Sequence, residues 1–309
     1  MTYTQEIQNK AKELLTSGQV EVVIGYELGP RGRTRPAFVY DPEDVERLVW
    51  NQACTHNLTT YLKEHLRPNH SEKQQGDKQG LRHVALVVKA CDSRAINVLL
   101  AENHFERQQL HVIGVACDGI LEGAGQAGNQ RSAHQLVTGD PPQYQTRCRH
   151  CNERMPVTYD TLIGKPEPQP ESGSNPVDQD AYQRLQAMTP SERAEFWLSQ
   201  FDRCIRCYAC RQACPMCDCP TCLYERDDSL WVGMGIGLNE KRTFHLGRAF
   251  HLAGRCVGCN ECERVCPMDI PISLLNRRLA QEVEAAFGHR AGMAPVAAPF
   301  VTVLSNPGG

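Results

Sequence analysis

The first part of the chain contains a helical apolar stripe, followed by continuous apolar runs. Four residues at helical spacing predict a helix that ends at Gly18: Ile7, Ala11, Leu14 and Leu15. Residues 20–26 then read as a strand. Asp41 followed by Pro42 has the form of an N-cap and a first-turn proline, which predicts a helix running to about Trp50.

Two uninterrupted apolar runs follow, at residues 84–88 and 111–116, and residues 94–103 between them suit a helix. Strands that lack polar alternation are buried on both faces, as in parallel sheets. A strand, a helix and a second strand in this order form a βαβ unit. The pattern therefore predicts an α/β domain with a parallel or mixed sheet over residues 1–164.

The second half of the chain has a different composition. Residues 165–188 begin with a stretch rich in proline, glutamate, serine and glycine, which predicts a linker. Residues 189–289 are expected to be helical, because Thr189 and Glu192 have capping-box spacing and residues 272–287 have an apolar helical side. Residues 290–309, rich in alanine, proline and glycine, are expected to form a flexible tail.

Composition narrows the class of protein. The 309 residues carry a net charge of −3, which gives no electrostatic reason to bind nucleic acid or an anionic membrane. The first residues lack the regions of a secretory signal, and no apolar stretch approaches the roughly 20 residues that span a bilayer. We therefore expect a cytoplasmic protein without a membrane span. In a reducing compartment, the 16 cysteines favour metal ligation over disulfides.

Two copies of the run Cys-x-x-Cys-x-x-Cys-x-x-x-Cys-Pro lie in the second half. In such runs the first three thiolates bind one 4Fe–4S cluster, and the fourth, before the proline, binds the other cluster. The predicted ligand sets are therefore crossed. The first set is Cys204, Cys207, Cys210 and Cys266. The second set is Cys256, Cys259, Cys262 and Cys214.

Structural zinc is the alternative interpretation of these runs. Zinc sites join two cysteine pairs around one tetrahedral ion, whereas these eight cysteines form duplicated runs of three plus one. The stretch between Cys214 and Cys256 is too long for a compact β-hairpin ferredoxin. It is similar instead to the α-helical ferredoxin domain of electron-transfer subunits in respiratory and methanogenic reductases.

Three further cysteines follow the first run closely: Cys217, Cys219 and Cys222. They are candidates for an extra metal site without an obvious fourth ligand. Cys54 is the only cysteine left unassigned that could supply one. The alternative, of equal weight, is that some of the three shield the neighbouring cluster.

Cysteines in the first half are candidates for a third cluster. Cys91 follows the first apolar run and Cys117 follows the second. The carboxyl ends of neighbouring parallel strands face one crevice, where ligands gather. Cys148 and Cys151 form a Cys-x-x-Cys pair downstream. Any one of these cysteines alone would more often be a core residue, but four of them could converge on one cluster.

These segments occur in an order that carries a family resemblance. They are Lys-Ala-Cys-Asp-Ser-Arg-Ala at 89–95, Ile-Gly-Val-Ala-Cys at 113–117 and Cys-Arg-His-Cys at 148–151, with Asp160 and Gly164 beyond. Together they resemble the beta-subunit family of deazaflavin-reducing hydrogenases and formate dehydrogenases. With Phe-Asp-Arg-Cys-Ile-Arg-Cys-Tyr-Ala-Cys at 201–210, the order is similar to bacterial members associated with formate dehydrogenases and heterodisulfide-reductase-like flavoproteins. The similarity spans about residues 10–285.

The resemblance carries its own expectations. In that family a cluster beside a flavin passes electrons between a catalytic subunit and an acceptor. It implies that Cys148 and Cys151 join Cys91 and Cys117 around a cluster. A glycine-rich segment contributes to the flavin site of flavin-binding members, and no such segment precedes residues 14–19 here. Bound FAD is therefore not expected.

The leading hypothesis is an iron–sulfur electron-transfer subunit of an oxidoreductase complex, not catalytic alone. Its expected partners are a catalytic molybdenum or tungsten oxidoreductase, such as a formate dehydrogenase, or a hydrogenase subunit, together with a flavoprotein or heterodisulfide-reductase-like protein. The alternative is a flavin-containing catalytic reductase that uses the clusters as its electron input. A scaffold with structural metal is a third class.

Two weaker signals are discounted. The glycines at 123, 125 and 128 match a dinucleotide-binding pattern, but they do not directly follow a predicted strand, so they predict a loop. His245 and His251 are six residues apart on a predicted helix and do not share a face as an i, i+4 pair would. Both are interpreted as packing or surface residues.

Overall fold

The computed structural model of the chain divides into two compact units. The first comprises Met1–Ser172 with Gly292–Ala297, and the second comprises Gly173–Ala291 with Ala298–Gly309. The structure describes residues 2–29, 32–66, 82–122, 144–149, 151, 153–165, 176–219, 222–225, 232–233 and 235–299.

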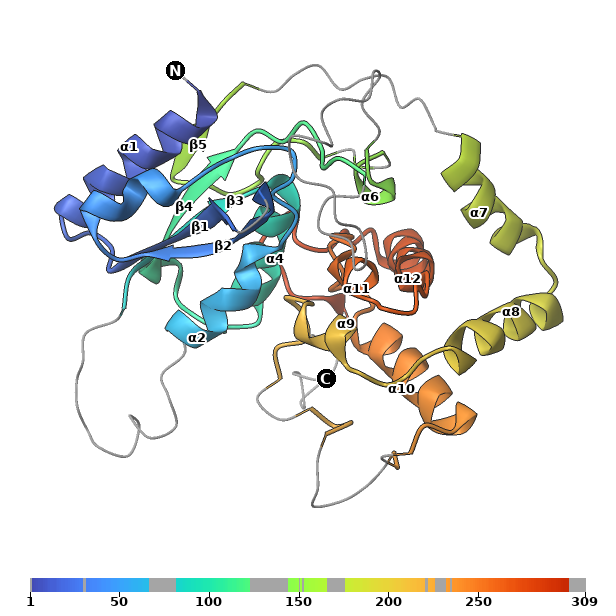
Figure 1. Cartoon of the computed structure of the whole chain (residues 1–309). Coiled ribbons are helices and arrows are strands. Elements are labelled where there is room, and N and C mark those ends of the chain that lie inside the picture. Colours follow the sequence, from blue (N-terminus) through green and yellow to red (C-terminus); the bar gives the residue numbers. More distant parts are fainter. Residues whose placement is uncertain are drawn as a thin grey trace, which may run out of the picture. The chain divides into compact units, whose positions relative to one another are not determined.

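In the described part of the first unit, the strands form one five-stranded sheet of order β2-β1-β3-β4-β5 (Figure 1). The strands are β1 (Val22–Leu28), β2 (Thr34–Val39), β3 (Val84–Val88), β4 (Leu110–Val115) and β5 (Thr161–Ile163). Neighbouring strands pair in parallel from β1 through β5, and β2 pairs antiparallel at the edge. The predicted α/β domain with a mixed sheet is confirmed.

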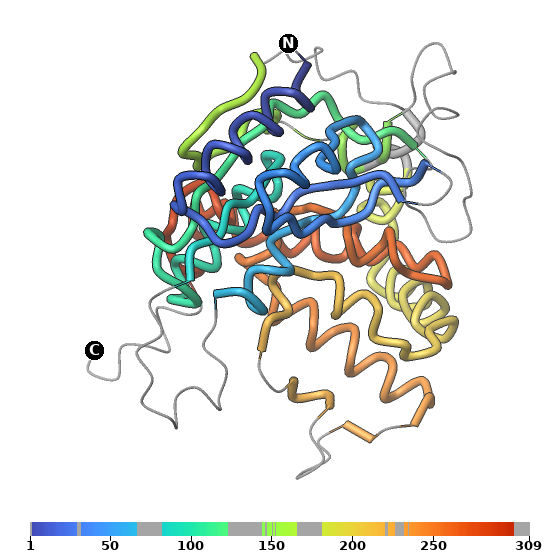
Figure 2. The backbone as a smooth tube through the Cα atoms, turned by 60° about the vertical axis from the view of Figure 1, so that its left-hand side comes forward, coloured from blue at the N-terminus to red at the C-terminus, as the bar shows by residue number. Residues whose placement is uncertain are grey.

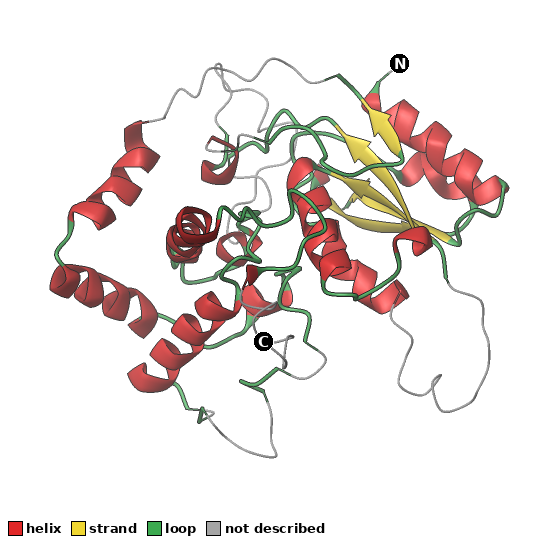
Figure 3. Ribbon diagram, turned by 180° about the vertical axis from the view of Figure 1, so that it is seen from behind, coloured by secondary structure: helices red, strands yellow, loops and turns green. Residues whose placement is uncertain are grey.

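Helices cover both faces of the sheet, because its central strands are apolar on both sides. On one face Val87 and its neighbours pack against Leu14 of α1 (Tyr3–Thr16). On the other face Leu86 packs with Ile96 of α4 (Ala90–Ala101). Figure 3 shows the N-terminal helix on one side of the strands and other helices on the opposite side. The remaining helical elements of this unit are η2 (Pro42–Arg47), η3 (Leu58–Tyr61), α2 (Leu62–Leu66), η4 (Arg107–Gln109) and α6 (Thr146–Arg149).

The helix predicted to run from Asp41 to Trp50 is wrong in length and type. The Asp41 side chain does accept a hydrogen bond from the backbone N–H of Glu43, as a cap should. The element is nevertheless a 3-10 helix that ends at Arg47. The 3-10 helix ends early because the N–H of Val49 donates to the carbonyl oxygen of Tyr26 at 2.8 Å. This hydrogen bond pairs the segment after the helix with β1.

The helix predicted over residues 94–103 begins earlier, at Ala90. The Asp92 carboxylate accepts a hydrogen bond from the N–H of Lys89 at 3.0 Å, so the helix starts almost directly after β3. Cys91 consequently lies in the first turn of α4. Strands β2 and β5 were not predicted, since β5 has only three residues and β2 contains Pro36, which an edge strand tolerates.

The second unit is helical in its described part. Its helices are α7 (Pro176–Ala187), α8 (Pro190–Asp202), α9 (Ala209–Gln212), α10 (Leu238–His251), α11 (Glu261–Arg264) and α12 (Ile272–Phe287). The capping box of Thr189 and Glu192 is confirmed, as is the span of α12. Helices α8 and α10 lie side by side (Figure 2). Between them Phe201 stacks on His245 at 4.7 Å, which confirms His245 as a packing residue.

Parts of three predicted segments lie outside the described residues. Of the span expected to be a linker, residues 176–187 form α7, and residues 166–175 are not described. Of the expected tail, Ala291 and Ala298 are buried, and residues 300–309 are not described. The glycine-rich match at 123–128 also lies outside the described residues. Among the described residues, no helix combines the length and apolar character needed to cross a membrane.

Candidate metal centres

The two cysteine runs of the second unit share one backbone path. In each run the second and fourth residues after the first cysteine have positive φ. They are Arg206 and Tyr208 at 51° and 58° in the first run, and Gly258 and Asn260 at 71° and 51° in the second. A one-turn helix then follows in each run, α9 and α11. Left-handed residues other than glycine are uncommon and mark constrained turns. Both runs are thus curled in the same way around their first three thiols.

The first run is held by its own arginine. Arg206 is buried, and its guanidinium donates to the carbonyl oxygens of Gly233 and Gly235. It also donates to the hydroxyl of Tyr208 at 2.6 Å. The backbone N–H of Arg206 points to the Cys204 sulfur at 3.3 Å. This residue therefore stabilises the left-handed turn and supplies a hydrogen bond to a candidate ligand.

Cys266, at the end of the second run, lies among the thiols of the first run. Burial is the main cause that raises the pKa of Cys210 to about 11, and charges on Cys204, Cys266 and Cys207 raise it further. The pKa of Cys204 is also raised, by burial first and then by Cys266 and Cys207. The Cys266 thiol of the second run therefore lies close enough to Cys204 and Cys210 to act on both, so the fold brings the first predicted set together.

Cys214, at the end of the first run, lies among the thiols of the second. Burial raises the pKa of Cys259 above its ordinary value, and the Cys214 charge is the next cause. Burial also raises the pKa of Cys262, with further contributions from Cys214, Cys256 and Cys259. The Cys262 sulfur accepts a hydrogen bond from the Asn276 side chain at 3.8 Å. The second predicted set is therefore also brought together.

An iron–sulfur cluster fits the chemistry of these donors. Closely spaced, buried thiols that raise one another's pKa cannot all ionise unless positive charge lies among them. Metal ligation requires thiolates and supplies that charge, because the metal stabilises the deprotonated form. Cys204, Cys207, Cys210 and Cys266 would hold one cluster, and the set with Cys214 would hold the other. Such clusters supply reversible one-electron transfer.

Arg248 on α10 lies between the two sets. It is only 4% exposed, and its Nη2 donates to the carbonyl oxygen of Cys210 at 3.0 Å. Burial opposes its charge, yet the charges of Cys217, Cys214 and Cys262 keep its pKa well above the ordinary value. A fixed buried cation beside cysteine thiolates stabilises added negative charge.

Arg248→Gln is expected to lower the reduction potential of a bound cluster by several tens of mV. Removal of the cation makes the reduced, more negative state less favourable, and about 59 mV in a one-electron couple corresponds to about 1.4 kcal/mol. Anaerobic redox titration followed by electron paramagnetic resonance measures the shift. Arg278→Gln, at an exposed arginine paired with Glu282, is the control and should leave all potentials unchanged. An unchanged potential in Arg248→Gln would contradict this role.

One of the three extra cysteines, Cys217, lies beside a thiol of the second set. The thiol of Cys217 is hydrogen bonded to Cys214, which lowers the pKa of Cys214 and raises that of Cys217. Cys219 is exposed and Cys222 is partly buried. Cys54 lies elsewhere, in the apolar core of the first unit, and it is 0% exposed with a pKa that burial raises to about 12. We therefore treat Cys54 as a core residue.

Three of the four candidate cysteines of the first unit interact directly. Burial raises the pKa of Cys117 to about 12, with further contributions from Cys148 and Cys151. Cys148 accepts a hydrogen bond from the N–H of Ile120 at 3.2 Å, in the segment after β4. Cys91 lies at the carboxyl end of the adjacent strand, since β3 and β4 pair in parallel. Cys117, Cys148 and Cys151 thus lie near one another, and Cys91 lies at the same edge of the sheet as Cys117.

A buried charged group that sequence reasoning missed lies at the same edge. Lys89 is 1% exposed and Asp92 is 0% exposed, with the ammonium 2.9 Å from the carboxylate. The ammonium also donates to the carbonyl oxygen of His56 at 2.7 Å and to the hydroxyl of Tyr26. Burial opposes the Lys89 charge, but Asp92, Tyr26 and Cys91 hold its pKa well above the ordinary value. The available signal was a lysine and an aspartate flanking a cysteine between two apolar elements.

Lys89→Met is expected to destabilise the first unit by about 3–5 kcal/mol, because it leaves Asp92 as an unpaired buried charge. Urea unfolding of the anaerobic chain, followed by circular dichroism, measures the change. The double variant Lys89→Met/Asp92→Asn should recover part of the loss, since no charge is then stranded. Equal losses in the single and double variants would show that the ion pair is not the cause.

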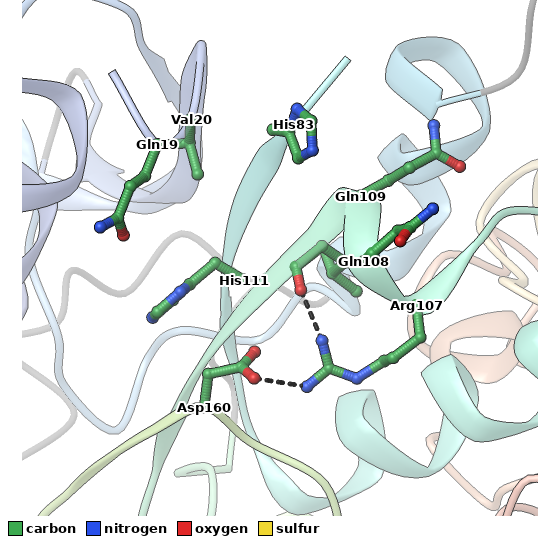
Figure 4. A pocket seen from close by; sticks show the side chains of 9 residues that line it. Gln19, Val20, His83, Arg107, Gln108, Gln109, His111 and Asp160 are labelled. Carbon is green, nitrogen blue, oxygen red and sulfur yellow. Dashed lines mark hydrogen bonds and ion pairs between the residues drawn. The ribbon is translucent and has the colours of Figure 1, made fainter. Parts of the chain in front are cut away.

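A polar hollow lies at the opposite, amino-terminal edge of the sheet (Figure 4). Arg107 forms an ion pair with Asp160, with Nη2 and Oδ1 2.8 Å apart, and its Nη1 donates to the carbonyl oxygen of Leu110 at 2.6 Å. The charges of Arg107 and Asp160 are therefore paired with each other. Ligands of open α/β sheets gather at the carboxyl edge instead, so the cysteines and not this hollow mark the candidate site.

Residues 203–271, which include both cysteine runs, match a protein family described as "4Fe-4S dicluster domain". This part of the chain is thus similar to a 4Fe-4S dicluster domain. The predicted 4Fe–4S clusters are thereby supported. The matched residues include both copies of the repeated backbone path and the cysteines of the second unit.

Two curated relatives extend the comparison. The chain is 35% identical over 99 residues to the F420-dependent formate dehydrogenase subunit beta of Methanocaldococcus jannaschii, which is 32% of this chain and 26% of the relative. It is 35% identical over 105 residues to the F420-dependent formate dehydrogenase 1 subunit beta of Methanococcus maripaludis, 34% of this chain and 26% of the relative. The matched part is thus about a quarter of each relative's length. The predicted resemblance to beta subunits of formate dehydrogenases is confirmed.

Proposed function

We propose that this chain is an iron–sulfur electron-transfer subunit that relays single electrons between a catalytic oxidoreductase subunit and a redox partner. The dicluster domain and the similarity to formate dehydrogenase beta subunits support this function. The chain offers thiols and buried cations as its chemical groups. Its own residues would bind clusters, shield them from water and set their potentials.

The observation that carries the proposal is the mutual proximity of thiols from the two runs. Cys266 acts on Cys204 and Cys210, and Cys214 acts on Cys259 and Cys262. Crossed ligation of two 4Fe–4S clusters accounts for both couplings, because the fourth cysteine of each run serves the other cluster. If each run bound its own zinc ion, thiols of different runs would not need to lie close together.

A third cluster in the first unit would use Cys91, Cys117, Cys148 and Cys151. The parallel pairing of β3 and β4 and the coupling of Cys117 with the later pair support it. Lys89 lies beside Cys91 and also acts on the pKa of Cys117. Its buried ammonium would offset the negative charge of a thiolate-ligated cluster.

The proposed partners follow from the chemistry of the clusters and from the relatives. A 4Fe–4S cluster carries one electron at a time, so two-electron chemistry must take place on another subunit. A molybdenum or tungsten formate dehydrogenase, a related oxidoreductase or a hydrogenase subunit would supply it. A flavoprotein or heterodisulfide-reductase-like protein would be the other redox partner.

Metal content tests the proposal directly. Three 4Fe–4S clusters predict about 12 irons and about 12 sulfides in each chain. Iron and acid-labile sulfide are measured on the full chain after anaerobic purification and reconstitution. A measured content of about eight irons for each chain would rule out the cluster proposed for the first unit. A chain with no reversible redox transition would contradict the relay function.

The second candidate function is a flavin-containing catalytic reductase. The similarity to beta subunits of formate dehydrogenases that are named F420-dependent is the observation in its favour. Acid release of flavin from the purified chain distinguishes the two. We expect no stoichiometric flavin, whereas about one flavin for each chain would favour the reductase.

A further inference from the structure

A small cavity in the second unit collects the three cysteines that neither cluster set uses. Cys217, Cys219 and Cys222 line it, and so does His251, the last residue of α10. The cavity holds ≈ 30 Å³ of space, and a water-sized occupant needs about 10–15 Å³. Its lining thus combines three soft sulfur donors and one imidazole around room for a single small ion.

Other contacts place some of these side chains in one neighbourhood. The charges of Cys222 and Cys217 both act on Arg211, although burial and the Glu225 hydrogen bond affect the Arg211 pKa more strongly. The Cys222 charge also acts on Tyr224, whose ring centre is 6.4 Å from that of His251. Cys222 and the end of α10 therefore share Tyr224 as a neighbour.

We propose that the three cysteines and His251 bind one tetrahedral Zn²⁺ ion. Three cysteines and one histidine are a standard structural zinc set, with Zn–S bonds of about 2.3 Å and a Zn–N bond of about 2.0–2.1 Å. The site is separate from both cluster sets and goes beyond the electron-relay function. It gives a role to residues that cluster binding leaves unused.

Ligand type favours zinc over a further cubane cluster. Three cysteines with one histidine are a standard structural zinc set, whereas 4Fe–4S clusters are typically held by four cysteine thiolates. In the described residues, no three of these ligand atoms lie within 4.8 Å of one another. An ion therefore has to draw the side chains inward, as structural zinc does when binding is coupled to folding.

Charge balance also fits. Three thiolates and one Zn²⁺ carry a net charge of −1, and Arg211, Arg248 and Arg255 line the same cavity. Arg255 lies 3.6 Å from Asp218, and Arg211 is paired with Glu225. Arg248 is the buried cation that faces the thiols of this region. The zinc site and the clusters would therefore share one compensating arginine.

The bound zinc ion would link the end of α10 to the segment that follows the first cysteine run. Cys217 is hydrogen bonded to Cys214, the last cysteine of that run. Cys217 would then be a ligand of the zinc ion, and Cys214 would be a ligand of the second cluster. Two neighbouring thiols would then serve two different metals.

Metal analysis of the full chain tests the site. Anaerobically purified protein should contain about one zinc for each chain in addition to its iron, with three sulfurs and one nitrogen in the zinc X-ray absorption spectrum. His251→Ala and Cys219→Ala should lower the zinc retained after dialysis against a chelator to near zero, without changing iron. His251→Cys should retain zinc and change its shell to four sulfurs.

A matched control is His289→Ala, in the same unit, where the imidazole contacts the Gly254 carbonyl at 2.9 Å. It should retain zinc with the wild-type shell. Wild-type protein without zinc, a four-sulfur shell in the wild type, or about four additional irons in place of zinc would each overturn the proposal. The iron and sulfide content reports on the relay independently, so failure of one proposal is distinguishable from failure of the other.

Discussion

Cys266→Ala is expected to abolish the cluster bound by Cys204, Cys207 and Cys210, although these residues belong to the other run. The loss of one of four thiolate ligands leaves an iron open, and the cluster degrades or loses that iron. The structural reason is the coupling of Cys266 to Cys204 and Cys210. Electron paramagnetic resonance and Mössbauer spectra of the reduced chain measure the effect, with an expected loss of up to about four irons.

The reciprocal variant Cys214→Ala should damage the cluster of Cys256, Cys259 and Cys262. Cys54→Ala removes a buried thiol of the first unit and should leave both spectra unchanged. If Cys266→Ala affects only the cluster of its own run, each run binds a separate cluster, and the crossed assignment is wrong.

Cys117→Ala is expected to remove the cluster proposed for the first unit while both clusters of the dicluster domain persist. Cys117 couples to both Cys148 and Cys151, so its loss removes one thiol of the proposed ligand set. Iron should fall by about four for each chain, by the cluster stoichiometry. Quantified spin in the reduced protein distinguishes this loss from partial loss of the other clusters.

Cys91→Ala tests the remaining ligand, which lies on the adjacent helix α4 rather than on the loop after β4. It should cause the same loss of iron as Cys117→Ala. Circular dichroism confirms that the sheet is retained in both variants. If iron is unchanged in both, the four cysteines of the first unit are ordinary thiols, and the relay is confined to the dicluster domain.

Local signals in the sequence predicted several elements correctly. The stripe ending at Leu15 and the capping box at Thr189 specify helix ends through contacts within a few residues, so they can be read from sequence. The run 84–88 has apolar side chains on both faces and is accordingly a buried central strand. Spacing alone also indicated both cysteine runs.

Elements that depend on distant partners were missed or misjudged. Strand β5 has three residues, and its place is decided by pairing with β4. The segment after Asp41 has a good cap, but a hydrogen bond from Val49 to β1 ends the helix early. From the sequence Cys54 was an unassigned candidate ligand. Only the packing of the sheet shows that it lies in the apolar core.

The sequence by itself determined the chemistry of this protein: two repeated cysteine runs that call for 4Fe–4S clusters, and strand and helix patterns that call for an α/β unit before them. The tertiary structure decided which thiols meet. It placed Cys266 beside Cys210, Lys89 and Asp92 in a buried ion pair, and His251 beside the three extra cysteines. The physical reason is that ligand spacing and helix capping act within a few residues, whereas proximity between distant residues arises only when the elements pack together.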